Sequence, residues 1–179
     1  MYRDVTLFDK TFSIYKKEEE ILAAIKNIAT AINRDYADKN PILIPILNGS
    51  FMFAADLMKE ITIPCEISFV KVASYNGTNS TGEINDLIGI NSDISGKEII
   101  ILEDIVDSGH TLSKLIPTFA AKSPAAIKVA ALLFKPNALK VPLTIDYVGM
   151  EIPNDFIVGY GLDYNELGRN LRHIYQLKH

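Results

Sequence analysis

Three acidic residues lie within five positions of one another, directly after a run of large aliphatic residues. The run is residues 99–102, and the acids are Glu103, Asp104 and Asp107. Acids that follow a buried strand point into the crevice where open α/β sheets bind their ligands. Carboxylates there can bind sugar hydroxyls or a divalent cation, although a single acid after a strand is usually a solvated turn residue. Three acids so close together favour a binding site.

The next residues, Ser108, Gly109, His110 and Thr111, have the composition of a phosphate-binding loop. Gly109 has no side chain, so the loop amides are open to close approach by an anion. Apolar residues recur at helical spacing after Thr111, which places the loop at a helix N-terminus, where phosphate binds readily. We expect Ser108 or Thr111 to cap the first helical turn. Acids at one end of the loop and an anion site at the other fit a phosphorylated sugar.

The strand that carries the acids needs a sheet around it. Four consecutive aliphatic residues at 99–102 are typical of a strand that is buried on both faces and ends in a polar loop. Aliphatic runs at residues 41–47 and 127–134 indicate neighbouring strands, and residues 65–72 alternate like a half-buried strand. Residues 16–38 carry an apolar stripe at helical spacing. The alternation predicts an α/β fold with a central, mostly parallel sheet flanked by helices.

Composition narrows the class of protein. The chain has 179 residues, of which 22% are charged and 48% hydrophobic, and this is ordinary for one soluble domain. Its net charge of -4 gives no support for wholesale binding of nucleic acid or of a membrane. Cys65 is the only cysteine, which excludes an intrachain disulfide and a thiolate metal cluster. No apolar run approaches the roughly 20 residues that span a bilayer, and the N-terminus shows no apolar leader, so we expect a cytoplasmic protein.

Residues 103–112 resemble the ribosyl-phosphate-binding signature of the type I phosphoribosyltransferases, and other motifs resemble their hypoxanthine-guanine branch. The resemblance extends from Leu47 to Arg169. It implies the type I fold in a single domain, 1–179, with a small hood built from the terminal segments and a purine-binding part at about 150–179. It also implies transfer of ribosyl 5-phosphate from 5-phosphoribosyl 1-pyrophosphate to hypoxanthine, and to guanine, with Mg²⁺ as cofactor. Members of the family are dimers or tetramers.

The resemblance also implies a role for each matching residue, and Asp107 becomes the general base that accepts a ring proton from the purine. Without the resemblance, the sequence would predict a core residue at Phe156, a turn residue at Asp163 and a solvated residue at the end of a strand at Lys135. The expected site residues are Glu103, Asp104, Asp107, Ser108, Gly109, His110 and Thr111 for ribose and 5'-phosphate, Asn48, Gly49 and Arg169 for pyrophosphate, Lys135, Phe156, Ile157 and Asp163 for the purine, and Glu103, Asp104 and Asp163 for the metal ion.

Two loops carry further expectations. Residues 74–82 break all periodicity, which fits either a hairpin tip or a mobile loop, and Ser74 with Tyr75 matches the start of the family's catalytic lid. Asn48 stands where many relatives have lysine, so a charged side-chain contribution is in doubt while a backbone role stays open. The resemblance places a cis peptide bond between Leu47 and Asn48.

Two other functions compete with the transferase. Domains of the same fold regulate nucleotide operons by binding RNA, and these should have a basic face, which the acidic balance disfavours. A phospho-acceptor signalling domain would use acids on separate strands, whereas here all three acids and the phosphate loop share one stretch. The sequence leaves open the preference among hypoxanthine, guanine and xanthine.

Overall fold

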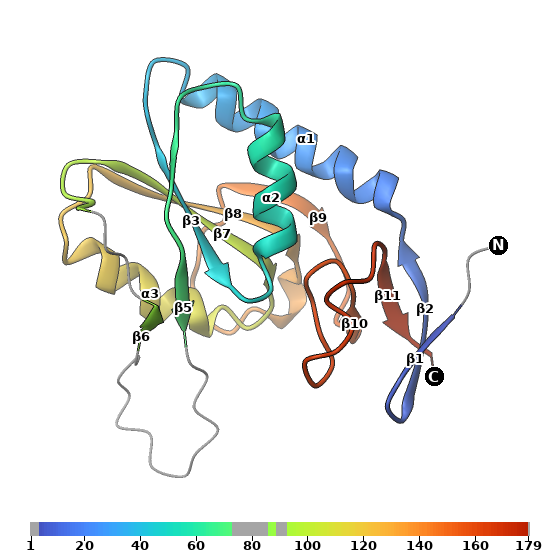
Figure 1. Ribbon diagram of the computed structural model, residues 1–179. Helices are drawn as coiled ribbons and strands as arrows, with labels where there is room; N and C mark the ends of the chain where they lie inside the picture. Colours follow the sequence, from blue (N-terminus) through green and yellow to red (C-terminus); the bar gives the residue numbers. More distant parts are fainter. Residues whose placement is uncertain (1–3, 73–85, 89–92, 179) are drawn as a thin grey trace, which may run out of the picture.

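The computed structural model describes residues 4–72, 86–88 and 93–178, which form a larger, mostly parallel sheet and a smaller antiparallel one (Figure 1). The strands of the larger sheet are β3 (Ile42–Leu47), β4 (Glu66–Ile67), β5 (Val70–Val72), β6 (Asp86–Ile88), β7 (Glu98–Val106), β8 (Ala126–Phe134) and β9 (Tyr147–Glu151). The strands of the smaller sheet are β1 (Val5–Leu7), β2 (Lys10–Lys16), β10 (Ile157–Val158) and β11 (Ile174–Leu177). The helices are α1 (Glu18–Asp35), α2 (Phe51–Glu60), α3 (His110–Ala120) and a short 3-10 helix, Pro136–Ala138.

Strand β7, which carries the acids, lies in the middle of the larger sheet. It pairs in parallel with β3 on one side and with β8 on the other. Strands β4 and β5 pair in parallel with β3, and β9 pairs in parallel with β8. Among the described strands of this sheet only β6 runs antiparallel, against β5. The predicted α/β fold with a mostly parallel sheet is confirmed, and the carboxyl ends of its strands meet at one edge.

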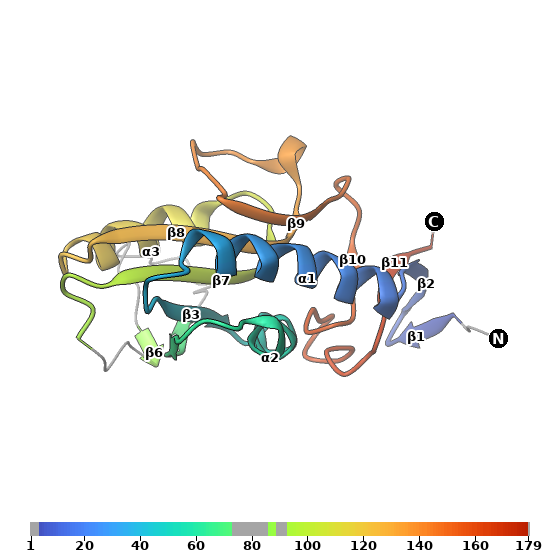
Figure 2. The ribbon, with the colours of Figure 1, turned by 90° about the horizontal axis from the view of Figure 1, so that it is seen from above.

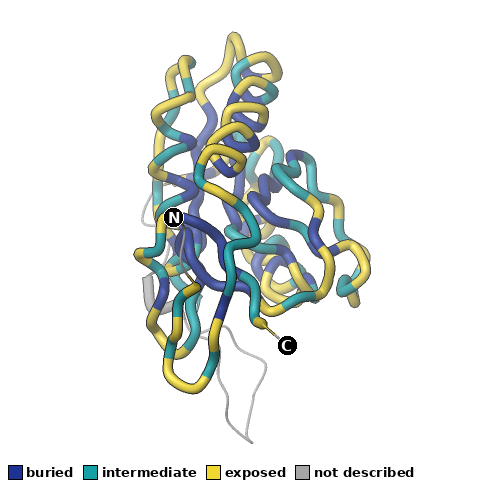
Figure 3. The backbone as a smooth tube through the Cα atoms, turned by 90° about the vertical axis from the view of Figure 1, so that its right-hand side faces the viewer, coloured by how far each residue is buried: buried dark blue, intermediate teal, exposed yellow. Residues whose placement is uncertain are grey.

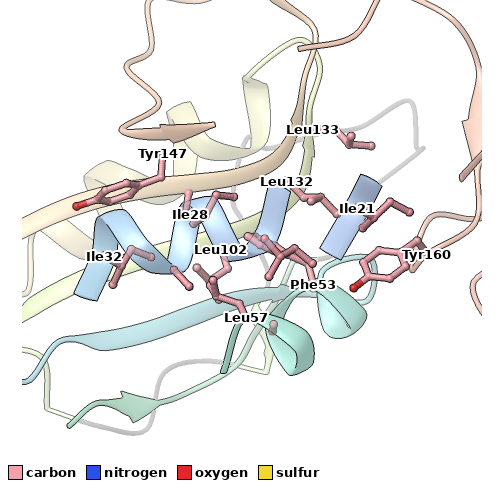
Figure 4. Close-up of a cluster of buried hydrophobic side chains, with 14 of the residues drawn as sticks. Ile21, Ile28, Ile32, Phe53, Leu57, Leu102, Leu132, Leu133, Tyr147 and Tyr160 are labelled. Carbon is pink, nitrogen blue, oxygen red and sulfur yellow. The ribbon is translucent and has the colours of Figure 1, made fainter. Parts of the chain in front are cut away.

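The aliphatic residues of β7 are buried on both faces, as their run predicted. Ile99 and Ile101 belong to the apolar cluster that includes α3, whereas Ile100 and Leu102 belong to the cluster that includes α1 and α2. Figure 4 shows the second cluster, with side chains of both helices meeting those of the sheet. Burial of such side chains stabilises the fold by roughly 1.5–3 kcal/mol each. This burial anchors β7 on both faces, so the acids that come after its aliphatic residues have a rigid support.

The structure corrects two expectations about strand boundaries. The polar loop does not begin at Glu103, because β7 continues to Val106 and Glu103 lies opposite Ala131 of β8. The neighbouring strand supplies backbone partners that outweigh the low strand propensity of the acids. The half-buried strand expected at residues 65–72 is instead two short strands, β4 and β5.

The smaller sheet is built from both ends of the chain, since β2 pairs with β11. We call this sheet and the loop of residues 159–173 the hood. Figures 1 and 2 place the hood at one end of the molecule, next to the carboxyl end of β3. Buried residues follow the strands, and exposed ones lie mainly on the outer sides of the helices and on loops (Figure 3). Within the described ranges, no helix is long and apolar enough to cross a membrane.

Candidate active site

Glu103 and Asp104 lie side by side near the carboxyl end of β7. Glu103 is only 7% exposed, and burial raises its pKa well above the usual value, with the charge of Asp104 adding to the effect. Burial also raises the pKa of Asp104, although backbone hydrogen bonds and the charge of Arg169 oppose that rise. Two desolvated carboxyl groups gain stability from a cation or from hydroxyl donors. The pair is therefore suited to bind ribose or a metal ion.

The loop between β3 and α2 packs directly against these acids. The peptide bond between Leu47 and Asn48 is cis, as the resemblance implied, and the Asn48 side chain is exposed. A Cβ atom built on Gly49 would lie 1.8 Å from Oδ2 of Asp104, so a larger residue at this position would displace the Asp104 carboxylate. Buried Ser50 connects this loop of residues 47–50 to β3, because its hydroxyl donates a hydrogen bond to the carbonyl oxygen of Ile46.

The hood covers the same loop with another glycine. A Cβ atom on Gly161 would lie 2.1 Å from the carbonyl oxygen of Gly49. Arg169 donates a hydrogen bond from Nη1 to the carbonyl oxygen of Gly161 at 3.0 Å, and its Nη2 lies 2.8 Å from Oδ1 of Asp163. Nε of Arg169 is buried without a hydrogen-bond partner among the described residues. An unsatisfied guanidinium N–H beside the Gly49 loop fits an anionic ligand.

Asp107 and Lys135 form an ion pair that the sequence did not reveal. Nζ of Lys135 lies 2.9 Å from Oδ2 of Asp107. The lysine side chain is 8% exposed and the aspartate 54%, so the ammonium group is enclosed while the carboxylate is open to a ligand. Backbone pairing brings them together, because the N–H of Lys135 donates to the carbonyl oxygen of Val106. The expected base and the expected purine-binding lysine thus share one site.

The N-terminus of α3 differs from expectation in its cap. Gly109 is the N-cap with φ 80°, and no side chain of the described residues caps the first turn, so the expected cap from Ser108 or Thr111 is wrong. A Cβ atom on Gly109 would lie 2.8 Å from Cδ1 of Leu139 and 2.9 Å from Cγ2 of Val141, two half-buried apolar side chains. The positive φ and these close neighbours both favour glycine at this position. The amides of the first turn remain without helical partners, which suits a phosphate.

Phe156 lies on the hood as an exposed aromatic side chain. It is 43% exposed, and its ring centroid lies 6.0 Å from that of Phe12 and 5.7 Å from that of Tyr164. Neighbouring Ile157 buries its side chain in β10, the outer strand of the smaller sheet. An aromatic face held by two others, next to an unpaired strand edge, offers both stacking and backbone hydrogen bonds to a flat ligand.

The structure brings seven of the expected site residues into two groups. One joins Glu103, Asp104 and Gly49 with the Arg169–Asp163 pair across Gly161, and the other is Asp107 with Lys135. Sequence reasoning missed Gly161, although the run Gly159-Tyr160-Gly161 signals close backbone approach. Ser74, Tyr75 and the lid at 74–82 lie outside the described residues.

A metal ion would have to be held by few protein groups. Within the part of the chain that the structure describes, no three His, Cys, Asp or Glu side chains converge as a metal cluster. Asp163 is engaged by Arg169, and its other oxygen accepts the N–H of Glu166 at 2.8 Å. Mg²⁺ characteristically binds through one or two carboxylates together with waters and substrate phosphates. The adjacent carboxylates of Glu103 and Asp104 fit that mode.

Comparison with known proteins agrees with this geometry. The phosphoribosyl transferase domain family matches residues 12–165. A hypoxanthine-guanine phosphoribosyltransferase of Streptococcus pneumoniae is 45% identical over 161 residues, covering 89% of each chain. The relative from Streptococcus pyogenes is 43% identical over 166 residues, or 92% of each.

Solved structures of the same group superpose closely. A hypoxanthine-guanine phosphoribosyltransferase of Bacillus anthracis, with a HEPES molecule in its active site, aligns with a TM-score of 0.86 and 41% identity, covering 93% of this chain and 97% of that one. A Trypanosoma cruzi hypoxanthine phosphoribosyltransferase aligns with a TM-score of 0.88 and 36% identity, covering 97% and 95%. The chain therefore belongs to the phosphoribosyltransferase family, in its group of hypoxanthine-guanine enzymes of purine salvage.

Proposed function

We propose that this enzyme transfers ribosyl 5-phosphate from 5-phosphoribosyl 1-pyrophosphate to hypoxanthine and guanine, giving IMP or GMP and pyrophosphate. The observation that carries the proposal is the packing of Asp104 against Gly49, with Arg169 held over the same loop through Gly161. Acids that can bind hydroxyl groups and a guanidinium group that can bind an anion therefore lie on either side of the loop that contains Gly49. A ribose that bears pyrophosphate needs both kinds of group close together.

The charges of the reaction fit these side chains. Departure of pyrophosphate from the anomeric carbon builds positive charge on the sugar and negative charge on the leaving group. Glu103 and Asp104 orient the ribose hydroxyls, while Arg169 and the backbone at Gly49 bind the pyrophosphate. Glu103 and Asp104 would hold Mg²⁺, which would neutralise charge on the leaving group, and Asp163 would join them only by releasing Arg169 or the N–H of Glu166. Residues 108–111 bind the 5'-phosphate at the N-terminus of α3.

The purine would lie between Lys135, Asp107 and Phe156. The Lys135 ammonium group donates to the 6-oxo oxygen, and Asp107 accepts a ring proton, which makes another ring nitrogen a better nucleophile. Phe156 stacks on the ring, and the Ile157 backbone contacts its edge. The ion pair of Lys135 with Asp107 supports this assignment, because it puts the donor and the acceptor within reach of one base.

Three further parts of the proposal rest on the family. Ser74 and Tyr75 open a lid that excludes water from the activated sugar. The enzyme works in the cytoplasm as a dimer or tetramer. In the Trypanosoma cruzi hypoxanthine phosphoribosyltransferase, the C-terminal region has a role in oligomeric state and enzymatic activity.

One experiment separates the enzyme from the RNA-binding alternative. The protein is incubated with phosphoribosyl pyrophosphate, Mg²⁺ and hypoxanthine, and IMP and pyrophosphate are measured. A parallel gel-shift series with RNA at rising salt detects the regulator. Equal amounts of IMP and pyrophosphate support the transferase, whereas absent IMP with salt-sensitive RNA binding overturns it. The relatives described above are named as enzymes, which favours the first outcome.

A further inference from the structure

A partly buried hydrogen bond ties the hood to α2, the helix that follows the loop of residues 47–50. The hydroxyl of Tyr160 donates to Oδ2 of Asp56. Tyr160 is 2% exposed, and burial together with this bond raises the pKa of its hydroxyl, which therefore stays a donor. Figure 4 shows the ring beside α2, with its oxygen on the side that faces the helix. Neither residue touches the acids or the ion pair described above, so the proposed mechanism leaves this bond without a role.

The bond lies next to the contact between Gly161 of the hood and Gly49 of the loop of residues 47–50. Tyr160 has φ 51° between two glycines that also have positive φ, so the chain turns sharply here. The next residue, Gly161, covers the carbonyl of Gly49, and its own carbonyl accepts from Arg169. Its N–H donates in turn to the carbonyl oxygen of Arg169. A displacement of Tyr160 therefore moves Gly161, and Arg169 moves with it.

The other end of the bond lies on a helix that continues directly from the loop of residues 47–50. This helix is α2, and the residue is Asp56. Its second oxygen lies 2.7 Å from Nζ of Lys59, one turn along the same helix. The bond thus spans the two elements that carry Gly49 and Arg169. Small shifts between such elements cost catalysis heavily, because groups must be placed within a fraction of an ångström.

We propose that Asp56 and Tyr160 are positioning residues, which hold the hood on α2 so that Arg169 stays over the Gly49 loop and binds the pyrophosphate group. This inference rests on the proposed function. The bond lies on the Arg169 side of the hood, so its loss should weaken phosphoribosyl pyrophosphate binding more than binding of the purine base, which the hood contacts through Phe156 and Ile157.

The test compares two partly buried tyrosine–aspartate bonds, one between the hood and α2 and the other between β9 and α1. Tyr160→Phe removes the bond in question. Tyr147→Phe is the matched control, since the Tyr147 hydroxyl donates to Asp35 at 3.1 Å, far from the carboxyl edge. We expect Tyr160→Phe to raise KM for phosphoribosyl pyrophosphate about 10-fold, the lower end of what a hydrogen bond to a charged group contributes, and to raise KM for hypoxanthine clearly less. Tyr147→Phe should leave both KM values at the wild-type level.

Two further measurements separate positioning from mere stability. Asp56→Asn keeps an oxygen acceptor and should retain most of the affinity that Asp56→Ala loses. Equilibrium titration with phosphoribosyl pyrophosphate and Mg²⁺ reads binding without turnover, so it tests the bond even if hypoxanthine is not used. Unchanged affinity in Tyr160→Phe, or an equal loss for both substrates, would overturn the positioning role alone. A wild type that binds phosphoribosyl pyrophosphate without using hypoxanthine would contradict the proposed function instead, and one that binds neither would overturn both.

Discussion

The ammonium group of Lys135 and the carboxylate of Asp107 lie 2.9 Å apart at the carboxyl edge of the sheet. They directly follow the paired strands β7 and β8, and 28 residues separate them in the chain. A purine bound here would meet a donor and a proton acceptor together. Substitutions of these two residues therefore test the proposed chemistry most specifically.

Asp107→Asn removes the proton acceptor and keeps the size of the side chain. General base assistance contributes about 100-fold to 10,000-fold, so kcat should fall within that range while the affinity for phosphoribosyl pyrophosphate is nearly kept. Steady-state kinetics and equilibrium titration measure the two quantities. Asp146→Asn is the control, because Asp146 pairs with Lys128 at 2.7 Å on the opposite edge. Equal losses of turnover and affinity in Asp107→Asn would contradict its role as base.

Lys135→Ala should lower kcat/KM selectively for 6-oxopurines, by ~10-fold or more, the scale of one charged hydrogen bond. The ammonium group donates hydrogen bonds and accepts none, so it suits a 6-oxo group and mismatches the 6-amino group of adenine. Phe156→Ala should weaken hypoxanthine and guanine alike, because stacking does not distinguish them. Unimpaired use of hypoxanthine by Lys135→Ala would show that the lysine does not contact the base.

Glu103→Gln should weaken substrate binding yet stabilise the fold. Burial raises the pKa of Glu103 above its ordinary 4.5, so the folded state holds a proton that the unfolded state releases. Stability from this group is full below about pH 4.5 and is lost as the pH rises towards the folded pKa. The melting temperature of Glu103→Gln should therefore exceed that of the wild type by a margin that grows with pH.

The control for this prediction is Glu98→Gln, at the opposite end of the same strand. Glu98 lies 2.5 Å from Nζ of Lys39, so its loss should not stabilise the protein. Thermal denaturation across the acidic to neutral range, without substrate, provides the measurement. A melting temperature of Glu103→Gln below that of the wild type at neutral pH would contradict the assignment of Glu103 as a desolvated acid kept for binding.

Gly109→Ala should lower the melting temperature more than Gly96→Ala. Both glycines have positive φ, where a side chain costs about 1 kcal/mol, but only Gly109 faces close neighbours, Leu139 and Val141. Around Gly96 nothing described lies within 4 Å of the new Cβ atom. Comparable decreases in melting temperature in the two variants would mean that residues 139–143 move aside at little cost and do not restrain the loop of residues 108–111.

The sequence predicted those parts of the site that one stretch of chain contains. The aliphatic run before Glu103 indicated a buried strand, and the acids and small residues after it indicated where ligands bind. The paired contacts were not visible, since Asp107 meets Lys135 and Gly49 meets Gly161 only through sheet pairing and hood packing. The end of β7 was misjudged for the same reason: partner strands override the low strand propensity of acids.

The base used by the wild-type enzyme tests the account most directly. Equimolar hypoxanthine, guanine, xanthine and adenine compete for limiting phosphoribosyl pyrophosphate with Mg²⁺, and mass spectrometry quantifies the nucleotides formed. A site built to bond one polar group discriminates strongly, because the wrong base leaves buried groups unpaired. The account predicts IMP and GMP with scarcely any AMP. AMP as the main product, or no nucleotide from any base, would contradict it.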